Sequence, residues 1–195
     1  YEEYLRRWAK HGSDNNRLQA HLKLGMYYWN RRGRRNRRRA LNEFERTLKV
    51  YNKLPEEAKK KAAKGRDAAA QAMFMIGEDI FEEMADMEID SRNEKQLQKK
   101  LQKKIAKAKE AEETFKKVFK FGRPDWTIAA FFRIGDGMQN LANTIRSSEC
   151  PKRLTYDQCE IYKGTLEDYA KQGEDSAVTY YEKALESSRE AKWFN

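Results

Sequence analysis

A short pattern recurs three times in this sequence, and it constrains the fold more than any other feature. An aliphatic residue is followed directly by glycine, and a large apolar residue stands three positions after the glycine. The three copies are Leu24-Gly25 with Tyr28, Ile76-Gly77 with Ile80, and Ile134-Gly135 with Met138. Each copy lies in a segment with helical apolar spacing, and repetition on this scale is typical of folds built from stacked helical units.

A second pattern follows each glycine further along the chain. A small residue, an aromatic residue four positions later and a small or β-branched residue three positions after that lie on one face of a helix. The members are Ala40, Phe44 and Thr47, then Ala111, Phe115 and Val118, then Ala177, Tyr181 and Ala184. A glycine lets a partner helix approach closely, and an aromatic ring fills the space beside it. We therefore expect each glycine-bearing helix to pair with one aromatic-bearing helix.

Composition favours an all-α chain. The 195 residues are 39% hydrophobic and 37% charged, with only 3 prolines and 10 glycines, and Ala, Glu, Lys, Gln, Arg and Leu, which enter helices at least cost, recur throughout. No apolar run approaches the roughly 20 residues that cross a bilayer, and no segment has the pattern of a signal peptide. The formal net charge of +10 favours anionic partners or surfaces.

The distance from each glycine to its downstream alanine grows along the chain, which predicts that the second and third hairpins are elongated. We expect helices at about 57–89 and 94–120 in the second hairpin, joined by a turn at 90–93, and at about 125–146 and 156–192 in the third. The whole chain is interpreted as one helical-repeat domain, with the end of a preceding helix at 1–13 and repeats at 14–55, 56–124 and 125–195. Because the sequence starts inside a helical pattern without methionine, we expect it to be a fragment of a longer solenoid.

These patterns resemble the tetratricopeptide repeat, whose first helix carries an apolar-Gly pair and whose second helix carries an Ala, aromatic, Ala series followed by proline. Pro124 stands at the expected place, whereas Pro55 is displaced by three residues. The large residue expected before the aliphatic one is His21, Met73 or Phe131. The resemblance implies a right-handed superhelical stack of antiparallel helical hairpins. It also implies a protein-binding scaffold and not an enzyme.

The last part of the chain is similar to a narrower group, the envelope tetratricopeptide proteins of myxobacteria and their relatives. Some of that group belong to the adventurous gliding-motility machinery. The residues that carry the similarity are Phe121 to Trp126, Ala129 to Gly135, Pro151 to Leu154, Cys159, Tyr162, Leu166, Glu167 and Ala177 to Leu185. The similarity implies a periplasmic or outer-membrane-associated scaffold that binds other proteins of an envelope or motility complex. A cytoplasmic location is the alternative.

Cys150 and Cys159 are the only cysteines, and they flank the expected turn between the two helices of the third hairpin. An envelope location implies that they form a disulfide. In a cytosolic protein, two free thiols are the expected state.

Seven arginines surround Gly33 and Asn36 at the expected tip of the first hairpin. They are Arg31, Arg32, Arg34, Arg35, Arg37, Arg38 and Arg39. Guanidinium groups suit phosphate and carboxylate partners, so this tip cluster is a candidate anion-contact surface. It carries the alternative function, a basic module that binds nucleic acid or an anionic envelope polymer. A solvated turn is the simpler interpretation.

Lysines are frequent between Lys95 and Lys109, on the flanks of a helical apolar stripe, whereas the preceding arm from Glu78 to Asp90 is acidic. An antiparallel hairpin lays these two segments side by side. We therefore expect internal charge complementarity there, with each exposed pair worth well under about 1 kcal/mol.

In the tetratricopeptide family, partners lie in a concave groove lined by the first helix of each hairpin. The residues at the matching offsets are Gln19, Leu22, Met26, Trp29 and Asn30, then Gln71, Phe74, Glu78, Phe81 and Glu82, then Ala129, Phe132, Asp136, Gln139 and Asn140. Aromatic anchors and amides suit an extended or helical peptide. The alternative is that the apolar members pack against neighbouring helices.

The sequence predicts no catalytic site, no metal site and no cofactor. It has no Gly-rich phosphate loop, no nucleophile elbow and no His-Glu metal motif. The two histidines are His11 and His21, and His21 occupies an apolar packing position, so we interpret it as a core or boundary residue.

Overall fold

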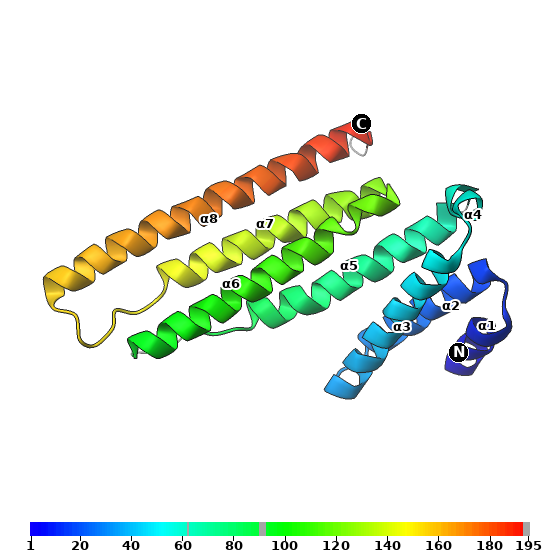
Figure 1. Ribbon diagram of the computed structural model, residues 1–195, viewed down its shortest axis with the longest axis horizontal. Coiled ribbons are helices and arrows are strands. Elements are labelled where there is room, and N and C mark those ends of the chain that lie inside the picture. Colours follow the sequence, from blue (N-terminus) through cyan, green and yellow to red (C-terminus); the bar gives the residue numbers. More distant parts are fainter. Residues whose placement is uncertain (62, 90–92, 193–195) are drawn as a thin grey trace. The chain divides into compact units, whose positions relative to one another are not determined.

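The computed structural model describes residues 1–61, 63–89 and 93–192, and within these ranges the chain is helical with no β-strand (Figure 1). This confirms the predicted all-α class. The helices are α1 (Glu2–His11), α2 (Asp14–Trp29), α3 (Arg34–Lys53), α4 (Glu56–Lys61), α5 (Ala63–Ala85), α6 (Glu94–Lys116), α7 (Pro124–Arg146) and α8 (Tyr156–Glu190), with a 3-10 turn, η1 (Phe119–Phe121), between α6 and α7.

The chain divides into two compact units. The first comprises Tyr1–Gly77 and Lys116–Thr127, and the second comprises Glu78–Phe115 and Ile128–Asn195. Helices α1, α2 and α3 therefore belong to the first unit, and α8 belongs to the second. Each unit has its own buried side chains, with Leu18 and Phe44 fully buried in the first and Met84 and Phe115 fully buried in the second.

Helices α7 and α8 begin and end close to the expected 125–146 and 156–192. At the start of α8, the Thr155 hydroxyl accepts from the Gln158 amide, and the Gln158 side chain accepts from the Thr155 amide. This reciprocal capping satisfies two backbone donors that a helix start leaves unpaired.

The prediction of a helix over 57–89 is wrong at its C-terminal end. Helix α5 ends at Ala85, four residues before the expected end. The chain leaves the helix in a tight turn, because the amide of Met87 donates to the carbonyl of Met84 at 3.2 Å. The Met87 carbonyl then accepts a bond from the Lys104 ammonium at 3.0 Å. The expected turn at 90–93 lies outside the described residues except for Asn93.

The structure confirms two of the predicted pairings between glycine and an aromatic ring. In the first unit, a Cβ atom at Gly25 of α2 would collide with the ring of Phe44 of α3. In the second unit, a Cβ atom at Gly135 of α7 would lie 2.6 Å from Cε1 of Tyr181 of α8. In both hairpins the ring occupies the space that the glycine leaves open, so the two helices approach closely.

The far end of the second unit is held by apolar packing and by covalent and ionic links between α7 and α8. Ala142, Ile145, Leu166 and Ala170 form a buried cluster. Cys150 and Cys159 form a disulfide across the connection, with their Cα atoms 5.9 Å apart.

An exposed arginine adds ionic links between α7 and α8. The guanidinium of Arg146 donates to Glu167 at 2.9 Å and to Glu174 at 2.6 Å. These hydrogen bonds lower the pKa of both carboxyls. Because all three groups are solvated, we expect the links to contribute little to stability.

The predicted charge complementarity between the lysine-rich helix and the acidic arm is observed at Lys107. Its ammonium lies 2.8 Å from Glu83 of α5 and 3.0 Å from Glu110 of α6. Lys104 of α6 is buried, and that burial lowers its pKa. In the described part of the chain, none of the helices combines the length and the apolar character that crossing a bilayer requires.

Candidate functional site

The tip cluster follows the end of α2 and runs into the first turns of α3. Arg34, Arg35 and Arg38 are exposed, whereas Arg37 and Arg39 are half-buried. The Arg37 guanidinium lies 3.2 Å from the centre of the Trp29 ring. Arginine often lies over an aromatic face in this way, because the electron-rich ring attracts the cation.

This contact connects the predicted groove with the tip cluster, which the sequence analysis described as two separate surfaces. Trp29 is a predicted groove residue, and Arg37 belongs to the tip cluster. Arg31 likewise lies over the Tyr27 ring, with its guanidinium carbon 4.2 Å from the ring centre. In the first unit, the aromatic end of α2 and the arginine cluster therefore form one surface.

Among the other predicted groove residues of the first unit, Leu22 is a core residue because only 6% of its surface is exposed. Leu22 therefore packs in the core, as the alternative to a groove position predicts. Met26 is half-buried and Asn30 is exposed. The amide of Gln19 donates to the carbonyl of Lys64 at 3.1 Å, so its polar group already serves the contact between α2 and α5.

The remaining groove residues of the first unit lie on α5. Gln71 is half-buried. The ring of Phe74 lies 5.4 Å from that of Trp126, whose indole nitrogen donates to Asp67 at 3.1 Å. Phe74 thus takes part in internal packing as well as reaching the surface.

In the second unit, three predicted groove residues belong to a polar network centred on Arg133. Arg133 donates to both carboxylate oxygens of Glu78 at 2.8 Å and to Asp136 at 3.1 Å, and its guanidinium lies 4.9 Å from the centre of the Phe81 ring. The Tyr181 hydroxyl donates to the other oxygen of Asp136 at 3.0 Å. The network therefore links α5, α7 and α8.

Burial decides the chemistry of this network. Glu78 is only 7% exposed, and burial raises its pKa while the hydrogen bonds from Arg133 oppose the increase. Burial and the bond to Asp136 raise the pKa of Tyr181 to about 12. Glu78 is therefore an internal ion-pair partner in this structure, whereas several other predicted residues of this face are accessible.

Those accessible residues are led by Phe132, which is 52% exposed although it packs on the Tyr181 ring at 5.4 Å. Glu82 is exposed, and Ala129, Gln139 and Asn140 are half-buried. The side-chain oxygen of Asn140 is buried and lacks a hydrogen-bond partner among the described residues.

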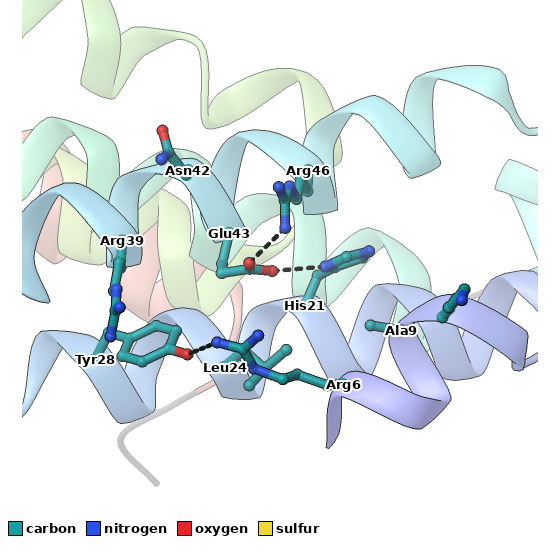
Figure 2. Close-up of a pocket in the computed structure, with 10 residues that line it drawn as sticks. Arg6, Ala9, His21, Leu24, Tyr28, Arg39, Asn42, Glu43 and Arg46 are labelled. Carbon is teal, nitrogen blue, oxygen red and sulfur yellow. Dashed lines mark hydrogen bonds and ion pairs between the residues drawn. The ribbon is translucent and has the colours of Figure 1, made fainter. Parts of the chain in front are cut away.

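A cavity of about 350 Å³ in the first unit was not predicted. It lies between α1, α2 and α3 (Figure 2). Its lining residues are Arg6, Ala9, Lys10, His21, Leu24, Tyr28, Arg39, Asn42, Glu43 and Arg46.

A buried histidine and carboxylate pair forms one part of the cavity lining. His21 Nδ1 lies 2.7 Å from Glu43 Oε2, and Arg46 donates to Glu43 Oε1 at 2.7 Å (Figure 2). The exposed fractions of His21 and Glu43 are only 9% and 8%. His21 is thus a boundary residue held by a hydrogen bond, as its packing position indicates.

A second chain of polar contacts lies between α1 and α2. The Arg6 guanidinium donates to the Tyr28 hydroxyl at 2.9 Å, and that hydroxyl donates to Glu2 at 2.6 Å. The bond from Tyr28 lowers the pKa of Glu2, and burial raises the pKa of Tyr28. Arg6 is consequently fixed by two partners.

One feature of the sequence, the position of Glu43, indicates a polar site at this place. Glu43 stands between Ala40 and Thr47 at a spacing that places it on the buried face of α3, beside Phe44. A carboxylate at such a position needs a polar partner across the helix interface. His21 of α2 supplies that partner, and Arg46 of α3 itself adds a second one. The contribution of Arg6 and Lys10 of α1 to the cavity has no counterpart in the sequence pattern.

The chain matches no family model, no curated protein and no solved structure.

Proposed function

We propose that this chain is a non-enzymatic helical-repeat scaffold of the tetratricopeptide type, a right-handed superhelical stack whose hairpins bind other proteins. The observation that carries the proposal is the repeated close packing of glycine against an aromatic ring, at Gly25 with Phe44 and at Gly135 with Tyr181. Repeated hairpins of one design present successive helix faces, and such faces form extended binding surfaces.

The accessible part of the predicted groove supplies aromatic and amide groups. Trp29 and Met26 are half-buried on α2, and Phe132 is exposed on α7. Large rigid side chains of this kind carry much of the binding energy in protein interfaces. We propose that the aromatic groups of each unit anchor a helical or extended peptide segment, whose polar groups bond to the amides beside them.

We also propose that the protein works in the cell envelope, in the periplasm or at the outer membrane, as a component of a gliding-motility or related complex. The resemblance of the segment from Phe121 onward supports this proposal. The disulfide between Cys150 and Cys159 supports it as well, since structural disulfides persist mainly in oxidising compartments.

Capture of partners from envelope extracts tests the scaffold function when it is compared between matched variants. We expect Trp29→Ala combined with Phe132→Ala to lose most of the proteins that the wild-type chain enriches in quantitative mass spectrometry. Tyr156→Ala combined with Tyr169→Ala removes two aromatics of α8 that are 80% and 57% exposed and lie outside the predicted groove. We expect this control to retain the partners, and equal loss in both variants would contradict the groove assignment.

A second candidate function rests on the tip cluster. Arg34, Arg35 and Arg38 are exposed, and the Arg37 guanidinium lies over the Trp29 ring, an arrangement that suits contacts to the phosphates of nucleic acid or to an anionic envelope polymer. Glutamine at Arg34, Arg35 and Arg38 together should abolish such binding, and rising salt should weaken it steeply in the wild type. Partner capture that survives these substitutions and high salt favours the scaffold function.

A further inference from the structure

The cavity between α1, α2 and α3 has no part in the proposed scaffold function, and its charge is unbalanced. Four of its lining side chains are cationic: Arg6, Lys10, Arg39 and Arg46. Arg6 is paired with Glu2, and Arg46 is paired with Glu43. In the described part of the chain, neither Lys10 nor Arg39 makes an ion pair, so the cavity carries an excess of two positive charges when His21 is neutral.

From this arrangement we propose that the cavity binds a small phosphate-bearing anion, either inorganic phosphate or the phosphate group of a compact metabolite. A phosphate group carries about −1.5 to −2 charges at neutral pH and so balances Lys10 and Arg39, whereas a carboxylate balances only one of them. Guanidinium groups match phosphate oxygens in geometry, and lysine adds a compact charge.

The size of the cavity fits such a ligand. A volume of about 350 Å³ lies at the lower end of the range of small-molecule sites, roughly 300–1,000 Å³. It exceeds what a phosphate group alone fills, so it has space for a small organic part. Leu24 and Ala9 give the lining an apolar portion.

Two of the four cationic groups are positioned before a ligand enters. Arg6 is fixed by Tyr28 and Glu2, and Arg46 is fixed by Glu43. The Arg39 guanidinium lies 5.6 Å from the centre of the Tyr28 ring (Figure 2). Because Arg6 and Arg46 already have partners that hold them, their ordering cost on binding is small, and the ligand has to order mainly Lys10.

The cavity and the tip cluster have one residue in common, Arg39, and are otherwise formed by different side chains. Arg34, Arg35 and Arg38 do not line the cavity. The two anion-binding hypotheses can therefore be tested with different substitutions in the same protein.

Isothermal titration calorimetry of the full chain with inorganic phosphate at low salt tests the proposal. We expect phosphate and sulfate to bind at least about tenfold more tightly than acetate, since each charge-assisted bond contributes a factor of this order. Lys10→Gln and Arg39→Gln should each weaken phosphate binding by about tenfold or more. The matched controls, Arg7→Gln on α1 and Lys49→Gln on α3, remove exposed charges outside both the cavity and the tip cluster and should change the affinity less than about twofold.

Thermal melts establish that all four variants remain folded, which is expected because none of the replaced side chains is buried. Glycerol phosphate that binds more tightly than inorganic phosphate would identify a phosphomonoester as the ligand, and the reverse order would identify the free ion. Both results support the site. Absence of phosphate binding by the wild-type chain, or equal weakening in the cavity variants and their controls, would overturn it.

Discussion

The first and third hairpins use the same pairing of glycine with an aromatic ring, but they complete it with different chemistry. Phe44 is fully buried beside Gly25. Tyr181 beside Gly135 is half-buried, and its hydroxyl donates to Asp136, the residue that follows the glycine. The glycine makes the close approach of the helices feasible, and the identity of the ring decides whether the contact is purely apolar or part of a polar network.

The two hairpins therefore differ in how they link their helices through polar groups. In the first hairpin, His21 and Glu43 bridge α2 and α3 beside the Phe44 ring, not through it. In the third hairpin, the Tyr181 ring itself carries the polar link, because its hydroxyl donates to Asp136, which also accepts from Arg133. A substitution of the ring should then affect packing alone in the first hairpin, and packing together with electrostatics in the third.

The largest effect is expected for Phe44→Ala. Removing a fully buried ring leaves a cavity against Gly25, and such truncations cost about 3 to 5 kcal/mol in the free energy of unfolding. Chemical denaturation followed by circular dichroism measures this loss. Phe44→Leu, which keeps most of the apolar volume, should cost clearly less, and equal effects of the two substitutions would show that the ring does not fill the space left by the glycine.

The next effect concerns a feature that only the third hairpin has. Replacing Cys150 and Cys159 together by serine should lower the free energy of unfolding by roughly 2 to 3 kcal/mol, because the disulfide closes a short loop in the unfolded chain. Their sequence separation is 9 residues. Hydrogen exchange in α2 and α3 should remain unchanged, and labelling of both thiols by an alkylating reagent in the unreduced native protein would contradict the disulfide.

Local spacing predicted the helices and which helices pair, whereas it did not predict individual hydrogen bonds and ion pairs between distant residues. The glycine and aromatic positions lie at fixed offsets within helices, so the pairs Gly25 with Phe44 and Gly135 with Tyr181 could be derived from periodicity. The bond between Arg133 and Glu78 joins residues 55 positions apart, and no local pattern indicates which carboxylate a given arginine will contact. The burial of Leu22 and Glu78 within the predicted groove could not be predicted for the same reason, because it depends on contacts with residues distant in the sequence.

A smaller effect is expected when the space beside the third glycine is filled. Gly135→Ala places a methyl group against the Tyr181 ring and should destabilise the protein by about 1 to 2 kcal/mol, since the overpacking exceeds the gain in helix propensity. Gly164→Ala is the matched control on α8, because nothing lies within 4 Å of a Cβ atom built there. It should stabilise the protein by roughly 0.5 to 1 kcal/mol, and the same sign for both substitutions would contradict the close approach at Gly135.

The smallest effect at neutral pH is expected for Tyr181→Phe, which removes one hydrogen bond to Asp136 and should cost about 1 kcal/mol. The substitution is best recognised by how it changes the dependence of stability on pH. The pKa of Tyr181 is about 12 in the folded state, against an ordinary value of 10.0, so above pH 10 the unfolded state loses its proton first.

The native state then binds more protons than the unfolded state, and stability falls as the pH rises from 10 to 12. We expect the wild type to lose on the order of 1 kcal/mol over this interval in excess of the loss in Tyr181→Phe. Parallel curves for the two proteins in urea denaturation at several pH values would show that Tyr181 does not titrate in this way.

The most direct test of the scaffold function is site-specific photocrosslinking in the cells that produce this protein. A photoreactive phenylalanine analogue is placed at Met26 or Phe132 on the predicted groove, and in control variants at Tyr156 or Ile161, which are 80% and 72% exposed on α8. The account predicts covalent adducts with the same partner protein from Met26 and Phe132 and none with that protein from the α8 positions. Adducts formed only from the α8 positions, or no protein adduct from the groove positions, would contradict it.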